Sequence, residues 1–325
     1  MARVEPIEFK VRFITPLLIH GANPRAADTM GLTGKALRGC WRFWFRALVG
    51  GMVRDITKET LLDLEGKVFG SSDEKIGAKF RIFIETLRKN SSSTRMDFSS
   101  RTVNFKGYKE GCSFSVRIIP RSNMTGDEVD ILFATIWLWA NLGGIGQRAR
   151  RGFGSPVIYM DNNNRLHEER FEKSGLPIKG SFETDTELKE YIKNGIKHAW
   201  DKMLDWCQNN NIQNFSPCIY DSGSNPPANP HFFSLSSLKQ VTIADKGLGS
   251  EAREALQKIH GNSSCSDLGT AIPERKASPV FVRLHKVKDE YYPVVTWSTP
   301  KSEGCDRNYV INDCNCRYYL DGSAV

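Results

Sequence analysis

Hydrophobic and charged residues alternate strictly near the start of the chain. Ile7, Phe9, Val11 and Phe13 share one face of an extended segment, and the residues between them are charged. A period of two is typical of a strand with one buried face. We therefore expect a first strand over residues 7–13.

The pattern changes to helical spacing over residues 33–49. Leu37, Trp41, Trp44 and Leu48 recur at steps of three and four, so at about 100° per residue they line one side of a helix. A second helix is expected at 129–142, because Thr125 and Glu128 have the spacing of a capping box just before an apolar run.

Alternation returns in two further segments and predicts strands at 78–87 and 113–120. A short strand is expected at 157–160. The serine-rich stretch 89–104 is too long for a tight hairpin, and we expect a mobile loop there. The resulting order in the first half is β-α-β-β-α-β, which is the order of the ferredoxin-like fold.

The polar stretch 161–180 has no apolar period, so we place a linker at 166–180 between an N-terminal domain (1–165) and a C-terminal domain (181–325). Thr184 and Glu187 predict the start of a long helix. A strand at 232–243, a helix at 250–260 and a hairpin of 278–287 and 291–297 follow. The expected fold class is therefore α+β, with two tandem ferredoxin-like (RRM-like) domains, the second more decorated.

Residues 143–155, just after the second predicted helix, combine five glycines with three arginines. Glycine lets backbone N–H groups approach a ligand, successive N–H groups can surround an anion, and arginine adds a planar, permanently charged fork. A base could stack on Phe153. A solvated turn is the alternative. The candidate RNA contacts are Gly143, Gly144, Gly146, Arg148, Arg150, Arg151, Gly152, Phe153 and Gly154.

The distribution of charge favours a polyanionic partner. The net charge is +8, and we count 25 Lys and Arg against 15 Asp and Glu in residues 1–160, compared with 20 against 22 in the remainder. Lys35, Arg38, Arg42 and Arg46 fall within an arc of about 80° on the polar side of the first helix, with no acidic residue among them. We interpret this basic ridge as an electrostatic track for RNA; an ordinary solvated helix face is the alternative.

Other chemistries have less support. Gly144 begins a G-x-G-x-x-A spacing, but it follows a helix rather than a strand, which excludes a dinucleotide fingerprint. His20 could act as a general base for attack by an RNA 2′-hydroxyl. Asp28 in the same loop could bind a metal, assist strand scission or simply stabilise a turn. Cys305, Cys314 and Cys316 would need a fourth ligand to bind zinc. We predict no cofactor and no metal.

The amino terminus lacks the apolar core of a signal peptide, and the longest apolar stretch, 131–140, is too short to cross a bilayer. These features predict a soluble, cytoplasmic protein without a membrane partner.

Several of these motifs resemble the RAMP superfamily of CRISPR proteins. The sequence GGIGQRARRGFGS after the second helix is similar to the glycine-rich loop of that superfamily, and segments 15–21, 32–39 and 68–71 fit the same family. Two further segments extend the resemblance to the family of subunits at one end of the type III-B (Cmr) effector complex. They are the aromatic run 40–46 within the first helix and the segment 275–279.

This resemblance implies a non-catalytic RNA-binding subunit of a type III-B CRISPR ribonucleoprotein. The expected partners are the 3′ region of the guide RNA, single-stranded target RNA and other RAMP subunits of the Cmr complex. In the family, a separate subunit cleaves the target with a loop aspartate, and the residues around Asp28 do not match it. The rival hypotheses are a metal-independent CRISPR endoribonuclease that uses His20 as general base, and a scaffold that binds only protein.

Overall fold

A computed structural model describes residues 5–21, 23, 26–89, 91–98, 101–159, 171, 174–221, 238–260 and 280–298. The first half contains β1 (Ile7–Phe13), α1 (Gly34–Met52), α2 (Lys58–Phe69), β2 (Phe80–Arg88), β3 (Ser91–Phe98), β4 (Arg101–Tyr108), β5 (Ser113–Pro120), α3 (Gly126–Leu142) and β6 (Pro156–Tyr159). The second half contains α5 (Asp185–Asn209), β7 (Leu238–Ile243), α6 (Ala252–His260), β8 (Val280–Val287) and β9 (Glu290–Ser298).

The first half is organised around a four-stranded antiparallel sheet with the strand order β2-β5-β1-β6. Ile118 of β5 pairs with Ile7 on one side and with Ile82 on the other, which fixes the register. β1 and β2 are joined through α1 and lie on either side of β5, so the connection is a split β-α-β unit. The four strands predicted for this half are confirmed.

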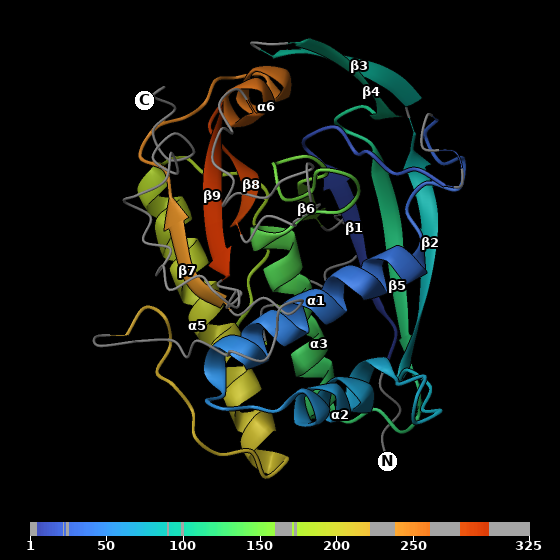
Figure 1. Cartoon of the computed structure of the whole chain (residues 1–325), viewed down its shortest axis with the longest axis vertical. Helices are drawn as coiled ribbons and strands as arrows, with labels where there is room; N and C mark the ends of the chain where they lie inside the picture. The colour runs from blue at the N-terminus through green and yellow to red at the C-terminus, as the bar shows by residue number, and fades with distance from the viewer. Residues whose placement is uncertain are drawn as a thin grey trace.

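Helices α1 and α3 cover one face of this sheet (Figure 1). Trp41 of α1 lies between Trp139 of α3, at a ring-centroid distance of 6.2 Å, and Phe80 of β2, at 6.3 Å. The capping box predicted at the start of α3 is present: the Glu128 N–H donates to the Thr125 hydroxyl oxygen, and the Thr125 N–H donates to the Glu128 carboxylate. Both predicted helices are therefore confirmed.

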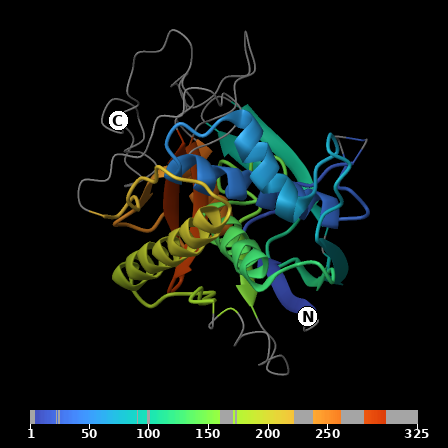
Figure 2. The same cartoon turned by 90° about the horizontal axis from the view of Figure 1, so that it is seen from below.

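The second half packs against the first through α5 and a three-stranded antiparallel sheet with the order β7-β9-β8. α5 lies beside α3 (Figure 2), and its apolar residues share one core with those of α3. Two side chains of β8 meet the C-terminal end of α3. Arg283 Nε donates to the carbonyl of Ala140 (3.0 Å), and His285 Nε2 donates to that of Asn141 (2.8 Å), so both satisfy carbonyls that a helix end leaves without partners.

Two expectations for the first half are wrong. Residues 89–104 are not a loop, because β3 and β4 pair as an antiparallel hairpin from Ser91 with Tyr108 to Phe98 with Arg101. Helix α2 was not predicted at all; it begins after Thr57, whose hydroxyl accepts from the N–H of Thr60 (3.2 Å). Both elements are insertions into the expected β-α-β-β-α-β order.

The described elements of the second half do not establish a second ferredoxin-like domain. The helices and strands predicted there are present as α5, β7, α6, β8 and β9, and Thr184 caps α5 as expected. Around the predicted linker, Phe171 and Leu176 are fully buried in the core that joins the halves. Residues 160–170 and the cluster Cys305, Cys314 and Cys316 lie outside the described residues. Within the described parts, none of the helices has the length and apolar character needed to span a membrane.

Candidate nucleic-acid interface

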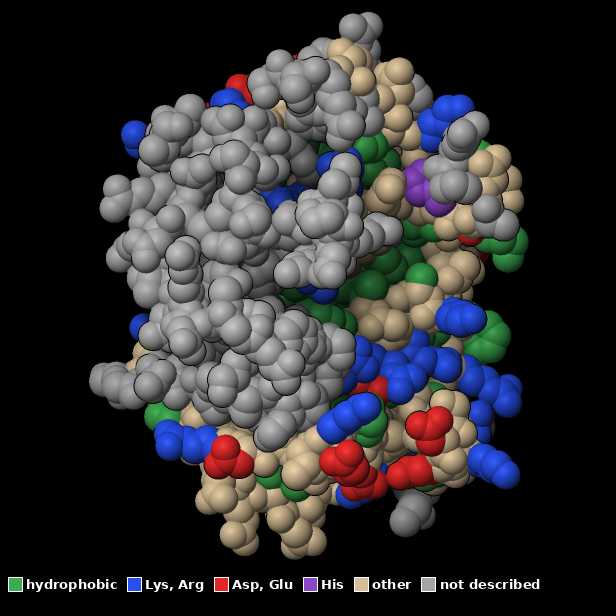
Figure 3. All heavy atoms as spheres, viewed as in Figure 1, with side chains coloured by type: hydrophobic (Ala, Val, Ile, Leu, Met, Phe, Trp, Pro, Cys, Tyr) green, Lys and Arg blue, Asp and Glu red, His purple; other side chains and the backbone are tan. Residues whose placement is uncertain are grey.

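Helix α1 has the two faces that its sequence predicts. Its N-cap Thr33 accepts from the Ala36 N–H (3.2 Å), and Leu37, Trp41, Trp44 and Leu48 are buried against the sheet and α3. The basic ridge lies on the outer side: Lys35 is exposed, and Arg38, Arg42 and Arg46 are partly exposed. In the space-filling view, Lys and Arg side chains form a band over this part of the molecule (Figure 3).

The ridge is partly neutralised by an acid from another helix. Glu65 of α2 is fully buried; its carboxylate accepts from Arg42 and, at 2.7 Å, from Nη1 of Arg46. As expected, α1 itself supplies no acidic residue, but Glu65 of α2 partly neutralises the charge of the ridge. Because one carboxylate serves two guanidinium groups, this trio retains one net positive charge.

Arg38 has a different environment. Its guanidinium carbon lies 5.8 Å from the centroid of the Phe80 ring, and its Nε is buried without a hydrogen-bond partner. Burial, together with the nearby charges of Arg42 and Arg121, lowers the pKa of Arg38. The side chain remains the permanent cation that the ridge requires.

The glycines of residues 143–155 let this loop pack closely against the segment after β1. Gly146 has φ +93° and Gly154 has φ +59°, conformations that favour glycine. A Cβ on Gly146 would lie 2.6 Å from the carbonyl oxygen of Leu18. The adjacent Gln147 N–H donates to that same oxygen (2.7 Å), and the Gly154 N–H donates to Pro16 (2.9 Å).

Much of the loop's backbone is therefore engaged internally. The N–H groups that donate to protein acceptors are those of Gly143, Ile145, Gln147, Ala149, Arg151, Gly154 and Ser155. The interpretation that the glycine N–H groups surround an anion is wrong for Gly143 and Gly154.

The arginines of the loop lie over aromatic rings. The guanidinium carbon of Arg150 is 4.4 Å from the ring centroid of Phe281 and 5.7 Å from that of Phe43 on α1. Arg148 lies 4.8 Å from the ring centroid of Phe105 on β4. Burial lowers the pKa of Arg150. These cation–π contacts hold the two guanidinium groups beside the aromatic rings.

The predicted role of Phe153 in base stacking is wrong for this structure. Its side chain is fully buried, and its ring centroid is 5.3 Å from that of Phe105, inside the core formed with α6, β8 and β9. The aromatic residues that accompany the loop arginines are instead Phe43, Phe105 and Phe281. All three come from segments far away in the sequence, on α1, β4 and β8, so no local signal could have identified them.

His20 and Asp28 are both tied to the backbone. His20 Nε2 lies 2.9 Å from the carbonyl oxygen of Lys106; because a carbonyl only accepts, Nε2 carries the proton, and Nδ1 is the basic atom. The Asp28 carboxylate accepts from the Met30 N–H (2.9 Å), which is the contact of a turn residue.

The ridge and the loop form one surface. Phe43 connects them, because it belongs to α1 and touches Arg150 of the loop. Above the band of basic side chains, Figure 3 shows a hollow with hydrophobic side chains on its floor. We call the basic ridge (Lys35, Arg38, Arg42, Arg46) together with the loop arginines (Arg148, Arg150, Arg151) the candidate RNA-facing surface.

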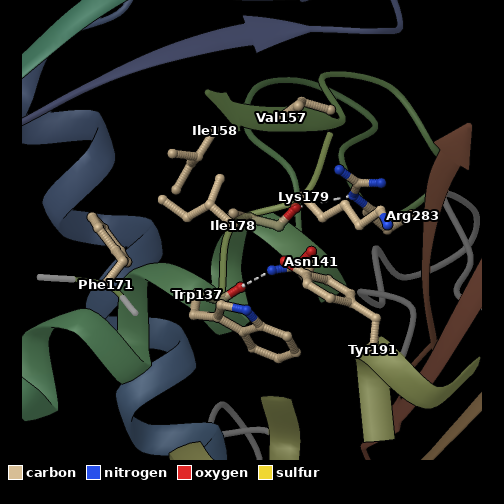
Figure 4. Close-up of a pocket in the computed structure, with 10 residues that line it drawn as sticks. Trp137, Asn141, Val157, Ile158, Phe171, Ile178, Lys179, Tyr191 and Arg283 are labelled. Carbon is tan, nitrogen blue, oxygen red and sulfur yellow. Dashed lines mark hydrogen bonds between the residues drawn. The ribbon is translucent and has the colours of Figure 1, made fainter. Parts of the chain in front are cut away.

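A separate small pocket lies between the halves of the molecule (Figure 4). Its polar lining groups are used internally: Asn141 Nδ2 donates to Trp137 (2.9 Å), the Tyr191 hydroxyl donates to Pro177 (2.8 Å), and Arg283 donates to backbone carbonyls. The residues that line the pocket thus hold α3, α5 and β8 together. Among the described residues, no three His, Cys, Asp or Glu side chains gather as they would around a metal ion.

Comparisons with known proteins match this architecture. Residues 10–157 match the sequence profile of the RAMP superfamily. The CRISPR system Cmr subunit Cmr1-2 of Pyrococcus furiosus is 27% identical over 186 residues, which cover 47% of this chain and 94% of that protein.

Solved structures share the fold at lower identity. The crystal structure of apo Cmr1 from Pyrococcus furiosus has a TM-score of 0.55 and 18% identity, covering 92% of this chain and 89% of that one. A chain in the cryo-EM structure of type III-B Cmr-β bound to cognate target RNA and AMPPnP, in the presence of ssDNA, has a TM-score of 0.54 and 13% identity, covering 90% and 94%. Residues 10–157 are therefore similar to the RAMP superfamily, and the chain as a whole is similar to the Cmr1 subunits of CRISPR Cmr systems.

Proposed function

We propose that this chain is a non-catalytic, RNA-binding subunit of a cytoplasmic type III-B Cmr ribonucleoprotein complex. In this proposal it contacts the 3′ region of the guide RNA and the single-stranded target RNA, and its protein partners are other RAMP subunits. The first sheet with α1 and α3 serves as a ferredoxin-like domain that carries the RNA-facing surface. The similarity to Cmr1 subunits supports membership of such a complex.

The observation that carries the proposal is the junction of two cationic groups at Phe43. The basic ridge approaches from α1, and Arg150 of the loop lies over the same ring. A chain of phosphates needs several cations in a row, and aromatic rings beside them suit unpaired bases. Sequence would be selected by base pairing with the guide, because phosphate contacts position a strand without identifying its bases.

The test avoids the two arginines that neutralise a buried carboxylate. Lys35 is exposed and Arg148 is partly exposed, whereas Arg42 and Arg46 neutralise buried Glu65. We therefore expect the double variant K35A/R148A to bind labelled single-stranded RNA more weakly. If each side chain contacts one phosphate, the slope of log affinity against log salt should fall by about 1.4.

The matched control is K193A/K197A, which removes two exposed lysines from α5, away from the RNA-facing surface. It changes the net charge by the same amount and should leave affinity and salt slope unchanged. Equal weakening in both double variants would mean that only net charge matters, and it would refute the proposed surface.

The absence of catalysis is the second part of the proposal. It is supported by the engagement of the Asp28 carboxylate in a turn. Purified protein incubated with CRISPR repeat RNA in EDTA should leave the RNA intact. Specific cleavage that is lost in H20A would establish the endoribonuclease alternative instead.

A further inference from the structure

Arg38 and Arg121 stand out among the basic residues near the ridge. Within the described parts of the chain, neither side chain has a carboxylate partner. The sheet register brings them to one place: Phe80 of β2, which lies beneath the Arg38 guanidinium, pairs with Pro120, and Arg121 is the next residue. Arg121 is exposed, and its guanidinium lies over the turn at Gly77.

A third guanidinium completes the group. Arg42 lies one turn after Arg38 on α1, and the charges of both Arg42 and Arg121 act on Arg38. The Glu65 carboxylate is paired with Arg42 and Arg46, which share its two oxygens. Three clustered cations repel one another unless an anion lies between them, and Arg38 Nε is a buried donor without a partner.

We infer that Arg38, Arg42 and Arg121 form a phosphate-binding site separate from the 143–155 loop. Its ligand class is a phosphate group carried by RNA, either an internal phosphodiester or a terminal phosphate monoester, so the inference rests on the proposed function. Guanidinium forks match phosphate oxygens in geometry and charge.

The position of the site defines the path that a bound RNA strand would follow across α1. At about 100° per residue, Arg38 is the member of the ridge that points farthest from Phe43 and the loop. An RNA strand held by both the loop arginines and this site must therefore cross the ridge. Figure 3 shows basic side chains continuing across this part of the surface.

The decisive variant is R121Q, because the exposed Arg121 side chain supports no described contact that the fold requires. R81Q is the matched control: Arg81 is exposed and adjacent to Phe80, but it points to the opposite face of the sheet. Single-stranded RNA titrations should show that R121Q weakens binding and lowers the salt slope by about 0.7, the value for one phosphate on a single strand. R81Q should match the wild type, and R121Q should keep the wild-type melting temperature.

RNA with hydroxyl groups at both ends, compared with RNA phosphorylated at either end, identifies the source of the phosphate. A defect in R121Q with every RNA supports an internal phosphodiester, and a defect confined to phosphorylated RNA supports a terminal phosphate. Wild-type affinity and slope in R121Q, alongside weakened K35A/R148A, would overturn this site and leave the proposed function standing. If wild-type protein fails to bind RNA at low salt, both are overturned.

Discussion

The guanidinium carbon of Arg150 lies 4.4 Å from the ring centroid of Phe281, which joins the 143–155 loop to strand β8. The loop backbone reinforces this contact, because the Val282 N–H donates to the Arg150 carbonyl (3.1 Å). Arg150 therefore belongs to the contact between the two halves as well as to the proposed RNA-facing surface.

This dual position predicts that R150A destabilises the fold. A partly desolvated cation over aromatic rings contributes about 2 kcal/mol, and we expect a loss of that order in the free energy of unfolding, measured by urea denaturation. K35A, which removes an exposed cation from the same surface, should change stability by less than about 0.5 kcal/mol. Equal stability of R150A and the wild type would show that the stacking contributes nothing.

The elements that could be predicted from the sequence are those determined by nearby residues. Alternation identified β1, and Thr125 with Glu128 identified the start of α3. The β3–β4 hairpin was missed because its serine-rich strands carry no clear alternation. Helix α2 was missed although Thr57 caps it, because its apolar pattern is weak.

In the candidate site, too, some features could be predicted from the sequence and others could not. The cationic residues were evident from their types and spacing, but their partners were not. Glu65 reaches Arg42 across a turn between two helices, and Phe153 is buried by residues of β4, α6 and β8. Such contacts arise from tertiary packing, which a local pattern does not encode.

The Glu65 carboxylate should be essential for stability despite its place beneath a binding surface. E65Q keeps the shape but replaces an acceptor with an amide whose N–H groups face two guanidinium donors. Because the group is fully buried, we expect a loss of about 2–3 kcal/mol in the free energy of unfolding.

The control for E65Q is D63N, which breaks the exposed pair between Asp63 and Lys67 (3.2 Å) on the same helix. An exposed pair of this kind contributes less than about 0.5 kcal/mol. Similar urea midpoints for E65Q and D63N would contradict the importance assigned to the buried carboxylate.

His285 predicts a dependence of stability on pH. Burial, with a smaller effect from the charge of Arg283, lowers its pKa well below the usual 6.5. The folded protein therefore keeps the ring neutral while the unfolded chain takes up a proton, so the stability contributed at neutral pH is lost as the pH falls below about 6.5.

Urea denaturation between pH 8 and pH 5 checks this effect. The free energy of unfolding should fall by up to about 1.4 kcal/mol per pH unit from this one group. H285Q, which retains an N–H donor for the Asn141 carbonyl, should remove that part of the slope. H198Q, on the exposed face of α5, should retain the dependence on pH. Identical pH slopes in the wild type, H285Q and H198Q would refute the assignment to His285.

Gly39 gives a test in which stability and binding change in opposite directions. It lies inside α1, it is exposed, and a Cβ built on it has no atom within 4 Å. Packing therefore does not require glycine here, and a helix-interior glycine costs about 0.5–1 kcal/mol relative to alanine. By helical spacing, Gly39 lies between Arg42 of the ridge and Phe43, where an RNA strand leaving the loop would meet the helix.

We expect G39A to raise the free energy of unfolding by about 0.5–1 kcal/mol and to weaken single-stranded RNA binding, because the added methyl group holds the strand away from the helix backbone. G39L should bind still more weakly while remaining folded. G126A is the matched control: Gly126, at the start of α3, is equally exposed and uncrowded but distant from the ridge. A stabilised G39A that binds RNA as tightly as the wild type would show that the strand does not pass over α1, and the path between the loop arginines and the ridge would have to be abandoned.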